Sequence, residues 1–336
     1  MALDVKVKID LIKPVGRVGF GIPLILEENA TTAKSYTECK DLSEVVAAGF
    51  AATTKTYKAA SLLFMQDNAP EKIAVCADTG AAVAWLSNVD NTSKDWRQLM
   101  VVNNGESEAV DNAALVAAVE ALDNKMYFAS LDTDDNTSIT VSDIERSVLF
   151  YVDATEQYPV PAAALVGATA GLDAGSFTYK NMILKGIVPQ SLTDTQIDAI
   201  HAKGGITFVT KAGDNVTTEG KVAGGEYIDI VDSKDYIIFN LEYQTQKLLN
   251  SSDKIPYDNS GIALLESVAV SVMKDAYNMG MIATNDDGTP GYTVSYAPRE
   301  QTSEDDRVIR KYIGGSFSFK LAGAIHNVEI TGEIMI

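Results

Sequence analysis

The sequence predicts a mixed α/β fold of the α+β kind, with a discontinuous two-domain body and an extended β-strand arm at each end. In the middle of the chain, short apolar runs alternate with helical patterns about a dozen residues long, which is typical of a sheet with helices on its faces. Two longer helical patterns follow, and apolar and charged residues alternate at both termini. A chain of 336 residues is long enough for two domains.

The first segment, residues 1–20, has the pattern of an arm. Its apolar residues take every second position, with charged residues between them: Leu3, Val5, Val7, Ile9 and Leu11. This alternation predicts a strand with one apolar face. A run of glycines and prolines between Pro14 and Pro23 then predicts a flexible link, so the arm can move relative to the body.

Residues 41–102 carry the patterns of two helices and two strands. Asp41 and Glu44 form the spacing of a capping box that opens a helix, and a second helix is expected from Tyr57 to Asp67. The apolar runs Ile73–Ala77 and Leu99–Val102 predict strands.

Residues 112–225 continue the alternation. Helices are expected over Asn112–Asp123 and after the capping pair Thr193 and Gln196, the second ending at Gly204. Strands are expected at Met126–Ser130, Val148–Val152 and Ile206–Val209. Residues 214–225 are rich in glycine, threonine and charge, which predicts a loop or a hairpin.

Two long amphipathic helices are expected next. Ser233 is the expected cap of the first, which carries apolar residues from Ile237 to Leu249. The second carries Leu264 to Ala276 on its apolar face and ends at Gly280. Residues 302–310 form a charged link to the C-terminal strands.

The C-terminal segment, residues 316–336, changes phase partway along. Apolar residues take odd positions and then even positions: Phe317, Phe319, Leu321 and Ile325, followed by Val328, Ile330, Ile334 and Ile336. A slip of one residue turns every following side chain to the other face, so a bulge or turn is expected near His326. The segment is therefore two short strands or one bent strand.

Composition excludes several functions. The formal net charge is −19, with 46 acidic and 27 basic residues, and such a surface repels nucleic-acid phosphates. No apolar run approaches the roughly 18 residues of a membrane span, and charges at residues 4–10 interrupt any signal peptide. Cys39 and Cys76 are too few for a disulfide scaffold or a cysteine-based metal site, which fits a reducing cytoplasm.

One acidic segment resembles a calcium loop. Asp132, Asp134, Asn136 and Asp143 fall at positions where such loops place oxygen ligands. However, Thr137 stands where the sharp turn needs glycine, and Asp143 replaces the longer bidentate glutamate. We therefore favour an ordinary acidic loop that caps the next element, and we expect no metal and no cofactor.

The remaining catalytic signals are weak. His201 and His326 lack neighbouring metal-ligand patterns, and a structural role is expected for each. The glycine-rich segments 167–175 and 220–225 match neither phosphate-loop nor dinucleotide spacing, which favours turns. Trp85 and Trp96 have no basic neighbourhood that would make a nucleotide stacking platform, so core packing or a subunit contact explains them more simply.

The order of these features resembles the contractile-tail sheath proteins of bacteriophages and related contractile injection systems. The segments that carry the resemblance follow one another along nearly the whole chain: AASLLFMQDNAPEKIAVCA at 59–77, GSFTYKNMILKG at 175–186, GKVAGGEYIDIV at 220–231, KIPYDNSG at 254–261 and FSFKLAGAIHNVEITGE at 317–333.

The resemblance implies a sheath-like organisation. Residues 1–20 would be an N-terminal linker arm and residues 316–336 the C-terminal linker strands, with 21–85 and 232–315 together forming an inner assembly domain and 86–231 an outer α/β domain. Copies of the chain would stack as six-fold rings around a tail tube, with baseplate and tail terminator proteins as further partners. Contraction would drive the tube through a target envelope.

The resemblance also locates the subunit contacts and the setting. The apolar residues of both arms would pair with strands of neighbouring copies by β-strand addition. The protein would lie in a virion tail and be assembled in the bacterial host cytoplasm, without inserting into a membrane. Two alternatives stay open, a soluble α/β enzyme of unknown chemistry and another virion component such as a tube or baseplate protein. No recognisable catalytic motif supports the enzyme, so we expect a non-enzymatic protein.

Overall fold

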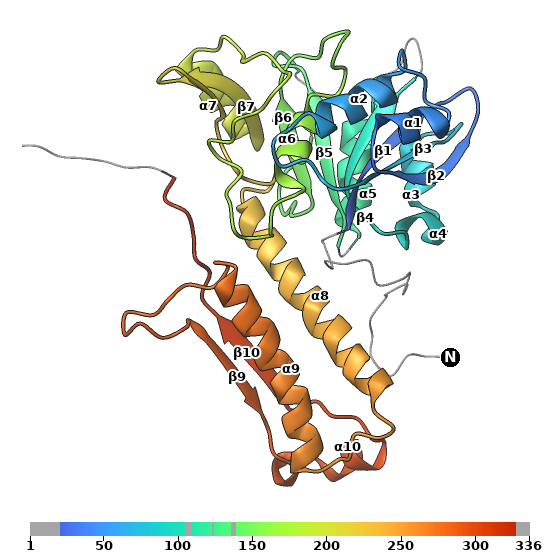
Figure 1. Ribbon diagram of the computed structural model, residues 1–336. Coiled ribbons are helices and arrows are strands. Elements are labelled where there is room, and N and C mark those ends of the chain that lie inside the picture. The colour runs from blue at the N-terminus through green and yellow to red at the C-terminus, as the bar shows by residue number, and fades with distance from the viewer. Residues whose placement is uncertain (1–20, 105–108, 123, 136–138, 327–336) are drawn as a thin grey trace, which may run out of the picture. The chain divides into compact units, whose positions relative to one another are not determined.

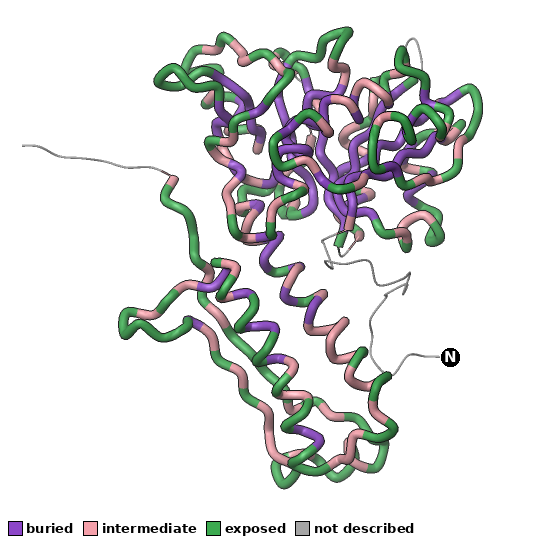
Figure 2. The backbone as a smooth tube through the Cα atoms, in the orientation of Figure 1, coloured by how far each residue is buried: buried purple, intermediate pink, exposed green. Residues whose placement is uncertain are grey.

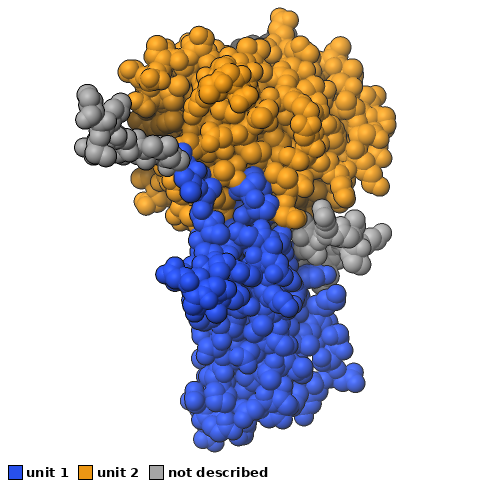
Figure 3. All heavy atoms as spheres, turned by 60° about the vertical axis from the view of Figure 1, so that its left-hand side comes forward, with its two compact units in different colours: residues 1–7, 174–177, 232–336 blue, residues 8–173, 178–231 orange. Residues whose placement is uncertain are grey.

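The computed structural model describes residues 21–104, 109–122, 124–135 and 139–326. Within them the chain forms two compact units (Figure 3). Of the described residues, unit 1 contains those within 174–177 and from 232 onward, and unit 2 contains those within 21–173 and 178–231. The first arm, residues 1–20, lies outside the described residues.

Unit 2 is built on an eight-stranded sheet in the order β2-β3-β1-β4-β5-β6-β7-β8 (Figure 1). The six central strands run parallel, and β2 and β8 pair antiparallel at the two edges. The strands are β1 (Ile22–Glu28), β2 (Lys34–Cys39), β3 (Ile73–Ala77), β4 (Trp96–Asn103), β5 (Met126–Leu131), β6 (Ser147–Tyr151), β7 (Gly205–Lys211) and β8 (Asp214–Thr217). The mixed α/β prediction is confirmed.

The predicted domain grouping differs from the observed units. Residues 21–85 were expected to join 232–315, but they supply β1, β2 and β3 of the same sheet that contains β4 to β8. Strand β1 lies between β3 and β4 and pairs with both in parallel. These shared backbone hydrogen bonds make 21–85 and 86–231 one unit, because a sheet cannot be divided between two of its central strands without losing them.

Seven helices connect the described strands of unit 2, and capping boxes were expected at two of them, α1 and α7. Asp41 caps α1 as expected, whereas Glu44 accepts from the N–H of Lys40 rather than that of the cap residue. Thr193 and Gln196 form the complete capping box expected for α7. The helices are α1 (Leu42–Ala47), α2 (Lys55–Phe64), α3 (Ala82–Leu86), α4 (Val89–Thr92), α5 (Asn112–Glu120), α6 (Ala162–Thr169) and α7 (Asp194–Ala202).

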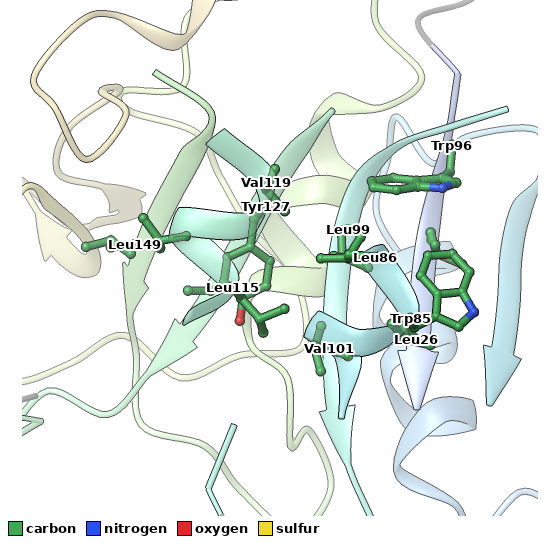
Figure 4. Close-up of a cluster of buried hydrophobic side chains, with 14 of the residues drawn as sticks. Leu26, Trp85, Leu86, Trp96, Leu99, Val101, Leu115, Val119, Tyr127 and Leu149 are labelled. Carbon is green, nitrogen blue, oxygen red and sulfur yellow. The ribbon is translucent and has the colours of Figure 1, made fainter. Parts of the chain in front are cut away.

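The helices of unit 2 cover both faces of the sheet. On one face, α3, α5 and α7 pack against the strands in a continuous apolar cluster that includes Trp85, Trp96 and Tyr127 (Figure 4). On the other face, α2 and α6 contact each other and the central strands. Gly167 allows this approach, because a Cβ there would lie within 3.0 Å of the Leu63 backbone. Both faces are therefore covered, and every residue of β1, β3, β4 and β6 is buried (Figure 2).

Unit 1 combines two long helices with a two-stranded sheet. Helix α8 (Ile228–Ser251) begins in unit 2 and continues through unit 1, and α9 (Asn259–Asn278) follows it. Strands β9 (Tyr292–Tyr296) and β10 (Gly315–Phe319) pair antiparallel, and between them lie the 3-10 helix η1 (Arg299–Gln301) and α10 (Glu304–Val308). Gly280 ends the second long helix as predicted, with a φ of 84°.

Two predictions for this region were wrong. Ser233 does not cap the first long helix, because α8 starts at Ile228 and Ser233 lies inside it, 2% exposed. Residues 302–310 are not a simple link, because Ser303 caps the short helix α10. Among the described residues, no helix has the length and apolar character needed to cross a membrane.

Candidate assembly surface

The β9–β10 sheet has two chemically different faces. Alternation places the aromatic and aliphatic residues of both strands on one face: Tyr292, Val294, Tyr296, Phe317 and Phe319. The opposite face carries exposed hydroxyls, and Thr293 and Ser318 hydrogen-bond across it at 2.7 Å. The apolar face is the one that can join a core.

Helix α9 supplies part of that core. It packs against β9, and its buried residues Ile262, Ala269, Val272, Met273 and Ala276 follow helical spacing along one side. The coverage is incomplete, because Phe317 stays 44% exposed and no residue of β10 is fully buried. This sheet therefore leaves apolar surface open to solvent.

The edges of the same sheet are also open. In the described chain, β9 and β10 pair with each other and with no further strand. A two-stranded sheet is marginal by itself, and an unpaired edge presents backbone N–H and C=O groups to any strand that approaches. The edges of β9–β10 are therefore suited to adding a strand, and its apolar face is suited to packing against further apolar side chains.

Three tyrosines hold the connection between the two strands. Tyr312 stacks on Tyr296 at 5.9 Å and meets Tyr257 edge-on at 6.1 Å. The hydroxyl of Tyr312 donates to the carbonyl of Ala297 at 2.9 Å, and that of Tyr257 donates to the carbonyl of Lys311 at 3.1 Å. Burial raises the pKa of Tyr312 and of Tyr296, which keeps both hydroxyls protonated. These contacts anchor the chain between the two strands against the end of β9.

The interface residues predicted from sequence fall partly on this surface. Phe317 and Phe319 stack on each other at 6.4 Å on β10, and Leu321 forms a single bridge with Ile282. Ile325 is 84% exposed. The others lie outside the described residues: Val5, Val7, Ile9, Leu11, Val328, Ile330, Ile334 and Ile336.

Strand β9 is the part of this surface that the sequence reading missed. Its alternation of Tyr292, Val294 and Tyr296 with Thr293 and Ser295 is a strand signal of the usual period-two kind. Strand β9 pairs with β10, which lies about twenty residues later in the chain, with two short helices between them. No local pattern predicts a pairing over this distance.

A cluster of polar side chains in unit 2 lies where open parallel sheets usually bind ligands. The strand order reverses at β1 and β4, and ligands favour the crevice at the carboxyl ends of such strands. Here the end of β1 carries two adjacent buried carboxylates, Glu27 at 4% and Glu28 at 5% exposure. Because neighbouring strand residues face opposite ways, each serves a different helical layer.

Both carboxylates are satisfied by the chain itself. Glu27 accepts from the hydroxyl of Thr56 at 2.5 Å and from the amide of Asn104 at 3.1 Å. Glu28 accepts from the amide of Asn103 at 3.1 Å and from the N–H of Ala82, the first residue of α3, at 2.8 Å. Side chains thus cross-brace the carboxyl end of β1, where an open parallel sheet would bind a ligand, and these glutamates tie α2, α3 and β4 to β1.

The acidic segment that resembles a calcium loop uses its carboxylates locally. Asp132 accepts from the N–H of Ala154 at 2.9 Å, and Asp153 accepts from the N–H and hydroxyl of Thr133 at 2.8 and 2.7 Å. Asp134 and Asp143 belong to no metal-like cluster in the described residues, and Asn136 lies outside them. The observed geometry is reciprocal capping between the chain after β5 and the chain after β6.

The other residues considered as catalytic or ligand-binding candidates make structural contacts or lie buried. His201 lies in the last turn of α7 with Nε2 2.9 Å from the Thr218 hydroxyl, and burial lowers its pKa. Trp85 and Trp96 pack together in the core at 6.2 Å. Both cysteines are buried as free thiols.

Comparison with known proteins adds a family match to unit 1. Residues 228–334 match the family described as E217 tail sheath protein gp31-like, C-terminal domain. The match begins where α8 begins and covers the β9–β10 sheet with its aromatic face. No curated protein matches the chain by sequence.

Solved structures match almost the whole chain. A chain of the anti-feeding prophage baseplate, described as 6-fold symmetrised, is 14% identical with a TM-score of 0.74, covering 99% of this chain and 100% of that one. A chain of the anti-feeding prophage helical sheath in contracted state is 13% identical, with a TM-score of 0.73 and 98% of each chain covered. A chain of the PVC sheath complex in contracted state, from an extracellular contractile injection system, is 10% identical, with a TM-score of 0.70 and 99% and 97% covered. The resemblance to contractile sheath proteins is confirmed at the level of fold.

Proposed function

We propose that this chain is a structural subunit of a contractile sheath, which polymerises with copies of itself around a tail tube. The observation that carries the proposal is the β9–β10 sheet, which keeps two open edges and a half-exposed apolar face. That sheet lies inside the segment that matches a sheath-protein domain family. Open strand edges and an exposed apolar patch are typical of a surface that binds another chain segment.

The proposed occupants are the terminal segments of neighbouring copies. Residues 1–20 and the part of the C-terminal segment that follows β10, residues 320–336, carry alternating apolar residues, as the sheet edges require. Backbone hydrogen bonds along an added strand are numerous, and flexible links let the linked bodies rotate without parting. Six-fold stacking is proposed by analogy with the six-fold symmetrised relative.

Contraction of the assembled sheath is a further part of the proposal. Two of the similar structures are sheaths in a contracted state. The free energy of contraction would come from contacts between the bodies that are better made in the contracted state, while the added strands keep the copies linked. The tube, baseplate and terminator proteins are the further partners, and the assembled tail of a virion or injection machine is the proposed location.

The enzyme alternative receives less support from the sheet. The region at the carboxyl ends of β1 and β4 is cross-braced through Glu27 and Glu28, whose oxygens accept hydrogen bonds from neighbouring residues. Converting it to a substrate site would require breaking these buried contacts. A non-enzymatic role needs no such change.

Negative-stain electron microscopy of the purified protein tests the proposal. The full chain should form rings or hollow cylinders, and deletion of residues 322–336 should abolish them. A monodisperse monomer that is indifferent to the deletion would contradict a sheath, and filaments of a narrow tube or baseplate-like plates would favour the other virion components.

A matched pair of point variants sharpens this test. Ile325 in the terminal segment and Val89 in unit 2 are both exposed aliphatic residues, 84% and 66% accessible. Ile325→Asp should weaken assembly while the free energy of unfolding of the monomer stays unchanged, and Val89→Asp should change neither. Equal effects of the two substitutions on assembly would count against strand addition at the C-terminus.

A further inference from the structure

The connection between α6 and β7 leaves unit 2 and returns to it. Before the excursion, the N–H of Gly171 donates to the carbonyl of Asn68 at 3.0 Å. After it, Tyr179 is 1% exposed, and its carbonyl accepts from the Thr217 hydroxyl at 2.6 Å. Between these two anchors, residues 174–177 pack with unit 1, and Figure 3 colours them with it. We call residues 174–177 the strap.

Gly175 fixes the strap at a point where only glycine fits. Its φ of +67° lies in the left-handed region that other residues adopt at a cost. A Cβ at this position would lie closer than 3.0 Å to Ser233 Oγ and to Met281 Cγ. The backbone of the strap therefore lies directly against these two side chains.

The two contacts of Gly175 belong to distant parts of unit 1. Ser233 lies in α8 and is 2% exposed, and Met281 follows the end of α9 and is 1% exposed. The N–H of Met281 donates to the Ala276 carbonyl at 3.0 Å, and its carbonyl accepts from the N–H of Ala322 at 2.9 Å. The strap thus completes the core where α8, the end of α9 and the chain after β10 converge.

The strap changes how many times the chain passes between the units. The described chain crosses at 173/174, at 177/178 and again at 231/232 within α8. Without the strap, α8 would be the single described crossing. We propose that the strap is a latch: seated against Ser233 and Met281 it restrains independent motion of the two units, and released it leaves them joined through α8 alone.

Hydrogen exchange and single-molecule energy transfer on the unassembled full chain test the latch. Gly175→Val should speed amide exchange of residues 174–178 by roughly tenfold or more, because the strap is expelled while the sheet of unit 2 keeps its protection. Fluorophores at Asp90→Cys and Asp286→Cys, exposed positions in units 2 and 1, should then report a broader distance distribution. The native Cys39 and Cys76 are 0% and 1% exposed and do not compete for label.

The chain provides a matched control and a rescue. Gly213 has a φ of +96° with nothing within 4 Å of its Cβ position, so Gly213→Ala carries the backbone strain alone. Gly175→Ala should loosen the strap where Gly213→Ala does not, and adding Ser233→Ala should restore part of the protection by removing Oγ. These readouts need no assembly, so they stay separate from the sheath proposal.

Two results would overturn the latch. One is exchange at 174–178 that is unchanged by Gly175→Val in a folded protein. The other is faster exchange there with a distance distribution as narrow as that of the unsubstituted chain, because the strap would then be local packing without influence on the units.

Discussion

Strands β6 and β10 are both five residues long, yet β6 is buried and β10 is largely exposed. Every residue of β6 (SVLFY) is buried between β5 and β7 and under helices on both faces. No residue of β10 (GSFSF) is buried, and β9 is its one strand neighbour in the described chain. The difference teaches that unit 2 completes its own core, whereas unit 1 leaves its sheet partly uncovered, as the proposed strand addition requires.

The largest expected effect comes from the core of unit 2. Phe150 on β6 is 0% exposed, and Phe150→Ala should lower the free energy of unfolding by about 3–5 kcal/mol, because it leaves a cavity between packed layers. Urea denaturation followed by circular dichroism measures the loss. Phe317→Ala on β10 is the matched control, with a cost below about 1 kcal/mol expected from its exposure. Equal losses would erase the contrast between the two strands.

The next effect concerns the cross-brace at β1. Glu28→Ala should cost about 3 kcal/mol, because it leaves the Asn103 amide and the Ala82 N–H without their buried acceptor. Glu38 on the edge strand β2 pairs with Lys72 at the surface, and Glu38→Ala should cost less than about 1 kcal/mol. A Glu28→Ala protein as stable as the Glu38→Ala protein would show that the fold tolerates the loss of this buried acceptor.

A buried lysine gives unit 2 a distinctive pH dependence. Lys125 is 6% exposed at the start of β5, and it donates to the carbonyls of Lys94 and Trp96 at 2.8 and 2.5 Å. Burial lowers its pKa to about 8, and Arg97 adds to this, while Asp95 opposes it. The unfolded chain therefore binds the proton more tightly than the folded chain.

The sign of the effect follows by linkage. Between pH 8 and 10 the unfolded lysine keeps its proton while the folded lysine loses it, so this group increases the free energy of unfolding by about 2 kcal/mol over that range. Burial raises the pKa of Tyr127 and Tyr36. Above the usual pKa of tyrosine the unfolded chain loses these protons before the folded chain does, so both tyrosines lower the free energy of unfolding as the pH rises further. Comparing denaturation of the unsubstituted chain with Lys125→Met across these pH values isolates the lysine, and parallel curves would refute its role.

The smallest effect tests how the chain between β9 and β10 is anchored. Tyr312→Phe removes the hydrogen bond to the Ala297 carbonyl while keeping the ring stack on Tyr296, and should cost about 1 kcal/mol. Tyr292→Phe on the same sheet should cost nothing measurable. Thermal denaturation of the two variants side by side decides whether the hydroxyl of Tyr312 contributes beyond its ring.

The sequence by itself determined the local elements that depend on neighbouring residues. The capping box at Thr193 and Gln196, the strand Ile73–Ala77 and the end of α9 at Gly280 follow from patterns a few residues long, and the structure contains each of them. The order of such patterns along the chain also identified the fold class, because helix and strand periodicity survive in any context that buries one face.

Tertiary structure alone decided which elements lie together. Strand β1 joins β3 and β4 in one sheet, so residues 21–85 belong with 86–231, although the sequence pattern placed them elsewhere. Glu27 and Glu28 look like surface charges until Thr56, Asn103, Asn104 and Ala82 converge on them. Residues 174–177 look like a loop until they pack with unit 1. Each of these depends on contacts between residues distant along the chain, whose pairing is decided by the packing of the whole unit rather than by any local pattern.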